Sequence, residues 1–65
     1  MKAKYDADTD ALYVRFTEAP VTESEEVRPG VMFDYDGDGR IVALEILDAS
    51  EHLSGGADLT RLSAA

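Results

Sequence analysis

The sequence predicts an α+β fold that is mostly β: a small antiparallel β-meander of about four strands, built as two hairpins, with a short C-terminal helix. Apolar and polar residues alternate with a period of two in residues 11–16 and again across residues 31–47, which is typical of half-buried strands. Asp38-Gly39, between two apolar runs, is a dipeptide preferred in tight hairpin turns. The 65 residues leave no room for a second core.

The first hairpin is expected in residues 2–16. Residues 2–5 form a short candidate strand, and the aspartate-rich residues 6–10 favour a turn because their side chains bond the local backbone. Residues 11–16 form the second strand. Its alternation places Leu12, Val14 and Phe16 on one face and Tyr13 and Arg15 on the other.

Residues 17–20 connect this hairpin to residues 21–27, which carry Glu23, Glu25 and Glu26. These residues are either an exposed edge strand or an extended loop. Charge on an edge strand resists unwanted pairing, so the glutamates have a structural use there. Pro29-Gly30 then predicts a type II turn or a bulge.

The central hairpin is expected in residues 31–47. Val31, Phe33 and Tyr35 share one face with Val42, Leu44 and Ile46. A two-residue loop pairs Tyr35 with Val42, Phe33 with Leu44, and Val31 with Ile46. A four-residue loop shifts this pairing by two but keeps the faces, whereas a slip by one turns the apolar set outward.

The second face of the sheet is also partly apolar, through Met32, Ile41, Ala43 and Leu47. We expect the C-terminal segment or a second copy of the chain to cover it. Asp48 and Glu51 have the spacing of a helix N-terminus, and Ser54-Gly55-Gly56 limits the helix to a turn or two. The expected domain therefore spans residues 1–53. The tail, residues 54–65, is either a further short helix over residues 57–63 or loose chain.

The charge of the chain restricts its partners. Fourteen acidic and six basic residues give a net charge of −8, which argues against direct nucleic-acid binding. It permits a small basic protein partner, and it also simply keeps a small domain soluble. With no cysteine, neither disulfides nor thiolate metal sites can stabilise the chain, so we expect a homo-oligomer, most simply a dimer.

The chain has no features of an exported or membrane protein. No apolar run follows Met1-Lys2, so a signal peptide is not expected, and no stretch approaches the ~18 apolar residues of a membrane helix. The absence of cysteine fits a reducing compartment. We therefore expect a cytoplasmic protein without membrane contact.

The two aspartate-rich turns resemble each other thirty positions apart. In an up-and-down meander both fall at one end of the sheet, where Asp6, Asp8, Asp10, Asp34, Asp36 and Asp38 crowd together. Low-affinity divalent-cation binding there is a weaker functional alternative. Residues 34–45 also match an EF-hand loop as a string, but extended flanks place Glu45 roughly 20 Å from Asp38, too far to share one ion.

Catalysis has little support in the sequence. His52 is the only histidine, and Ser24, Ser50, Ser54 and Ser63 lie in expected loops or caps without a recognisable nucleophile setting. We assign no catalytic, cofactor-binding or metal-binding residue, and we expect a protein that is not an enzyme. Tyr13 and Arg15 either belong to a binding surface or pack across strands.

The motifs of the chain resemble those of a known family. Tyr-Asp-x-Asp-x-Asp-Ala-Leu-Tyr-Val-Arg-Phe is followed in order by Glu-Val-x-Pro-Gly-Val, Asp-Tyr-Asp, Gly-Arg-Ile-Val and Glu-Ile-Leu-Asp-Ala-Ser. This set is similar to the domain-of-unknown-function 2283 family of small bacterial proteins, over residues 4–53. The resemblance implies a small antiparallel sheet with a C-terminal helical piece and no established activity or cofactor. Members of the family are often encoded beside small proteins that resemble toxin-like modules.

The sequence therefore predicts a small acidic domain whose function is protein interaction. The first interpretation is a non-enzymatic, self-associating interaction module. The alternative is an antitoxin-like or inhibitory partner that covers a small basic protein with its acidic turns and residues 23–26.

Overall fold

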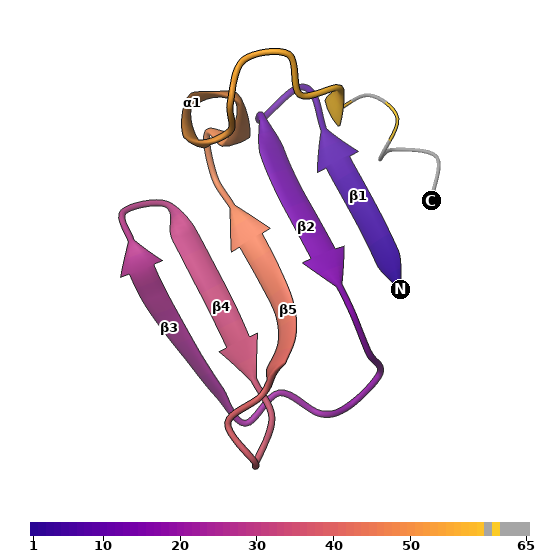
Figure 1. The fold of residues 1–65 in the computed structure, drawn as a ribbon, viewed down its shortest axis with the longest axis vertical. Coiled ribbons are helices and arrows are strands. Elements are labelled where there is room, and N and C mark those ends of the chain that lie inside the picture. Colours follow the sequence, from indigo (N-terminus) through magenta and orange to yellow (C-terminus); the bar gives the residue numbers. More distant parts are fainter. Residues whose placement is uncertain (60, 62–65) are drawn as a thin grey trace.

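A computed structural model describes residues 1–59 and 61 of the chain and shows five strands and one short helix among them (Figure 1). The elements are β1 Lys2–Asp6, β2 Ala11–Arg15, β3 Glu23–Arg28, β4 Val31–Tyr35, β5 Ile41–Ile46 and α1 Ala49–His52. The expected mostly-β class with a C-terminal helix is confirmed. The additional strand is β3, which settles the choice between edge strand and loop for residues 21–27.

The five strands form one sheet in the order β1-β2-β5-β4-β3, with every neighbouring pair antiparallel. The simple meander expected from the sequence is therefore wrong. Residues 16–22 cross the end of the sheet, and β5 returns to lie between β2 and β4 (Figure 1). The sheet combines a β1–β2 hairpin with a β3–β4–β5 meander, and β5 is its central strand.

The β4–β5 hairpin keeps most of the predicted register. Val31 pairs with Ile46 and Phe33 with Leu44 as predicted, but Tyr35 pairs with Ile41 because the register shifts after Asp34. Neither the two-residue nor the four-residue loop occurs. Asp36 N–H donates to the Arg40 carbonyl at 2.9 Å, which closes a three-residue loop. Gly39 ends the loop with φ 78°, the left-handed position that this turn requires.

The β3–β4 connection is a turn at Pro29-Gly30. Gly30 has φ 85°, as the third position of a type II turn requires after a proline. A register irregularity between Glu26 and Arg28 accompanies it. The turn and the bulge, which the sequence offered as alternatives, therefore occur side by side.

The buried core lies on one face of the sheet, which we call the core face. Leu12, Val31 and Ile46 form it with Ala49 of α1, and these side chains are at most 8% exposed. Leu53 and Leu59 pack against the same cluster. The described part of the C-terminal segment thus packs on the core face. Of the two covers predicted for the second face, this segment is therefore wrong for the described residues, and a second copy of the chain stays a prediction. The expected helix over residues 57–63 falls partly on residues 60, 62 and 63, outside the described residues.

The helix α1 starts where the sequence predicted, but its cap differs. Asp48 occupies the N-cap position with φ 52°, and its side chain makes no cap hydrogen bond within the described part of the chain. The left-handed backbone turns its carboxylate away from the helical N–H groups that an N-cap normally accepts from. No helix among residues 1–59 and 61 is long and apolar enough to cross a membrane.

Candidate interaction surfaces

The two aspartate-rich turns lie at opposite ends of the sheet (Figure 1). The β1–β2 turn is beside α1, whereas the β4–β5 turn is at the far end. The prediction that both share one end is wrong, because β3 adds one more reversal of the chain before β4. Within the described residues no group of three or more His, Cys, Asp or Glu side chains is placed to hold a metal ion. The shared cation site at the turns is therefore overturned.

Asp10, in the first turn, anchors α1 to the sheet. Its carboxylate accepts the Tyr5 hydroxyl at 2.6 Å, the Ser50 hydroxyl at 2.6 Å and the Ser50 N–H at 3.2 Å. Its carbonyl accepts the Ala49 N–H at 2.8 Å. The bonds from Ser50 and then Tyr5 lower the pKa of Asp10, and the bond to Asp10 raises the pKa of Tyr5. Asp10 therefore takes the capping role that the sequence predicted for Asp48.

His52, the last residue of α1, packs against the β3–β4 turn. A Cβ atom at Gly30 would lie 3.0 Å from the His52 Nε2 atom, so the ring would have to shift to admit any larger residue. The Nδ1 atom is buried and has no hydrogen-bond partner among the described residues. The Ser50 hydroxyl donates to Asp10 and the Ser24 hydroxyl donates to Asp34. Both serines therefore have a structural role.

Tyr13 and Arg15 point away from the core face, as predicted. The Arg15 guanidinium donates to the Tyr13 hydroxyl at 3.3 Å and to the Ala19 carbonyl at 2.9 Å, and its Nε lies 3.2 Å from Glu18. The bond to Tyr13, and then the nearby carboxylate of Glu18, raise the pKa of Arg15. All these partners lie on β2 or in the connection that follows it, so the choice between a binding surface and cross-strand packing stays open for this pair.

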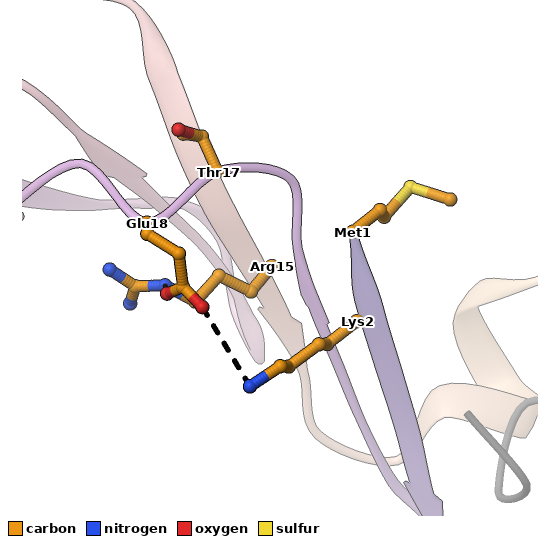
Figure 2. Close-up of a pocket in the computed structure, with 5 residues that line it drawn as sticks. All are labelled: Met1, Lys2, Arg15, Thr17 and Glu18. Atoms are coloured by element: carbon orange, nitrogen blue, oxygen red, sulfur yellow. Dashed lines mark ion pairs between the residues drawn. The ribbon is translucent and has the colours of Figure 1, made fainter.

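A pocket of about 110 Å³ lies between the start of β1 and the end of β2 (Figure 2). Arg15 and Lys2 converge there on the carboxylate of Glu18, at 3.2 and 3.7 Å. Glu18 pairs with both cations and offsets one of their two charges, so the pocket is an internal ion-pair cluster. The lysine and the glutamate are more than 70% exposed, which limits the energy of their pair.

The face of the sheet opposite the core face, which we call the outer face, carries a mixture of charged, large uncharged and small side chains. On β2 and β5 it presents Tyr13, Arg15, Ala43 and Glu45, and on β4 it presents Met32 and Asp34. Ala43 is 0% exposed beneath its longer neighbours. No segment of the described chain forms a second layer over this face (Figure 1).

The core face is covered only at the end near α1. Further along it, Val14, Phe33 and Leu44 are half-buried and Phe16 is 44% exposed. At the edge, all six residues of β3 are exposed. Glu25 of this strand accepts the Tyr35 hydroxyl at 2.9 Å, which raises the pKa of Tyr35. The surface thus offers an incompletely covered apolar face, a charged face and an acidic edge.

These features define a small β-domain with one antiparallel sheet and a helical C-terminal piece. The family model described as "Protein of unknown function (DUF2283)" matches residues 2–50 of the 65. The chain belongs to this family, which confirms the resemblance seen in its motifs. Neither the comparison with curated proteins nor that with solved structures found a match.

Proposed function

We propose that the protein is a non-enzymatic, self-associating interaction module of the cytoplasm. The observation that carries the proposal is the single-layered sheet. Stable domains bury a sheet face against a second layer of structure, and here the four-residue helix α1 covers only one end of one face. Ile41 and Leu47 remain 45% and 49% exposed. A second copy of the chain supplies the missing layer.

The size of the chain supports the same proposal. A domain of about 60 residues buries only about 60% of its unfolded surface, and its conformational entropy nearly cancels the gain from burial. The chain has no cysteine to form a disulfide, which leaves association as the available source of further stability. The same absence fits a reducing compartment.

Sedimentation velocity over roughly 1–100 μM protein tests the proposal, because mass action shifts an associating chain toward the dimer across such a range. We expect a sedimentation coefficient that rises with concentration, and a melting temperature that rises with it. A cooperatively folded monomer with a constant melting temperature over the whole range contradicts the proposal.

A second candidate function rests on β3. This edge strand presents free backbone groups and the carboxylates of Glu23, Glu25 and Glu26, a surface suited to a small basic protein. The protein would then act as an antitoxin-like or inhibitory partner. Co-purification with the product of an adjacent gene tests this function. Binding should weaken in high salt and in the triple Glu→Gln variant of β3, and binding that is insensitive to salt contradicts the charge mechanism.

A further inference from the structure

Two rows of side chains cross the outer face, and each row takes one residue from every strand. In strand order the first row is Lys4, Tyr13, Glu45, Met32 and Glu26, and the second is Lys2, Arg15, Ala43, Asp34 and Ser24. The hydrogen bonds from Arg15 to Tyr13 and from Ser24 to Asp34 agree with this common face. In both rows the cations lie on β1 and β2, and the carboxylates lie on β5, β4 and β3.

This distribution of charge is unusual for the chain. The molecule carries −8 overall, yet three of its six Lys and Arg residues lie in these two rows, where three carboxylates balance them. Two copies of an acidic protein repel each other least where their local charge is zero and is divided into complementary halves. The two rows meet both conditions, although Glu18 beside Lys2 and Arg15, and Asp6 at the next outward position of β1, add two carboxylates at the edge of this face.

We infer that a second copy of the chain docks on the outer face across a two-fold axis that runs parallel to β5. The inference rests on the proposed self-association and assigns it a surface and a symmetry. Because β5 is the central strand (Figure 1), this axis places β1 opposite β3 of the second copy, and β2 opposite its β4.

The pairs that this axis creates are complementary. Lys4 faces Glu26 of the second copy, and Arg15 faces its Asp34. Tyr13 faces Met32 of the second copy, an aromatic–thioether contact. Lys4 and Glu26 each lie two strand spacings from β5, about 9.6 Å, and stacked sheets are about 10 Å apart, within reach of two long side chains. Glu45 is the exception, because it faces Glu45 of the second copy across the axis.

The dimensions of the molecule fit this contact. The two longer dimensions of the molecule, 34 and 25 Å, span a rectangle of about 850 Å² that includes the sheet, α1 and the loops. This outline is close to the ~800 Å² that a standard stable interface buries on each partner. At the centre of the outer face Ala43 is fully buried beneath its longer neighbours, so those neighbours make the contact with the second copy. On the core face, α1 and Leu53 rise above one end of the sheet and prevent a flat stack of the same kind.

Charge reversal and rescue test the inference. We expect Lys4→Glu and Glu26→Lys each to weaken dimerisation by about tenfold or more, because two attractive pairs per dimer become repulsive. The double variant should return to within about threefold of the wild type. Lys4 and Glu26 are four strands apart within one copy and cannot compensate there, so rescue reports a contact between copies. Glu45→Gln should tighten the dimer, because it removes the like charges at the axis.

Phe16→Ser on the core face is the control, and it should leave the dimer affinity unchanged. The neutral variants Lys4→Gln and Glu26→Gln, checked by circular dichroism, replace any reversed variant that does not fold. A wild-type protein that stays monomeric overturns both the proposed function and this inference. A dimer that loses affinity with Phe16→Ser but not with either charge reversal leaves self-association standing and overturns the outer-face contact. If Lys4→Glu and Glu26→Lys each weaken the dimer but the double variant does not regain affinity, the two-fold pairing is overturned.

Discussion

The two aspartate-rich turns start from the same local chemistry and end in different roles. In the β1–β2 turn the Asp6 carboxylate accepts the Asp8 N–H at 3.0 Å, and in the β4–β5 turn Asp36 accepts the Asp38 N–H at 2.9 Å. The residues then diverge. Asp36 also accepts the Arg40 N–H at 3.0 Å and stays within its own loop. Asp10, at the position that corresponds to Arg40, binds Ser50 forty residues away.

The difference shows that a turn motif determines local backbone bonding but not what the turn supports. Asp10 has φ 55°, a left-handed conformation that aspartate tolerates because its short side chain bonds nearby groups. That conformation turns both its carbonyl and its carboxylate toward the start of α1. The β4–β5 turn has no helix beside it, so the same residue type closes the hairpin and does nothing further (Figure 1).

Replacing Asp10 and Asp36 tests the difference between the two turns most directly. We expect Asp10→Ala to give the largest loss of stability of any variant discussed here, because it removes the bonds from Tyr5 and Ser50 and places alanine at positive φ. Asp36→Ala should cost about 1 kcal/mol, since it loses only bonds within its loop. Urea unfolding at one fixed protein concentration measures both, and equal losses would contradict the assigned difference in role.

Gly30 and Gly39, in turns at opposite ends of the sheet, test whether packing against α1 makes one end more sensitive to substitution than the other. Gly30→Ala should destabilise the protein by about 2–3 kcal/mol, because positive φ is combined with a Cβ 3.0 Å from His52 and 3.3 Å from the Leu47 carbonyl. Gly39→Ala should cost about 1 kcal/mol, since it meets the same backbone strain with no described atom within 4 Å. Thermal unfolding measures the two variants, and a cost at Gly39 equal to that at Gly30 would show that packing against α1 is unimportant.

Lowering the pH should weaken the attachment of α1 to the sheet, because it protonates Asp10. Its pKa in the folded protein is lowered, so the folded state favours the ionised carboxylate. The contribution is complete above the ordinary carboxyl pKa of about 3.9 and is lost as the pH falls through the lowered value. We therefore expect the stability difference between wild type and Asp10→Asn to shrink as the pH falls below about 4. Melting temperatures from pH 7 to pH 2 measure it, with Asp36→Asn as the matched control, and a difference that stays constant contradicts the assignment.

Much of the local structure could be predicted because its causes are local. The alternation in residues 11–16 and 31–47 places Leu12, Val14, Val31 and Phe33 on one face, and the structure confirms that face. Val31 pairs with Ile46 as predicted because a slip by one residue would expose the apolar set. The prediction failed at Tyr35, where a bulge shifts the register without leaving a signal in the apolar pattern.

The larger errors in the prediction, the strand order and the placement of the two turns, come from the uncertain assignment of β3. Its glutamates make it ambiguous between strand and loop, and one added strand reverses the direction of everything that follows. The direction of β4 in turn decides at which end of the sheet Asp36 lies. The two rows on the outer face depend on the same strand order, because Lys4 and Glu26 are counterparts only when β5 lies midway between β1 and β3.

By itself the sequence determined the class of fold, the positions of most strands and turns, and the side chains that share the core face. These follow from a period of two residues and from the backbone preferences of Asp, Gly and Pro, which act over a few positions. The tertiary structure alone decided the strand order, the separation of the two turns, the cover on the core face and the role of Asp10. These depend on contacts between distant residues, such as Asp10 with Ser50, for which the chain carries no local pattern.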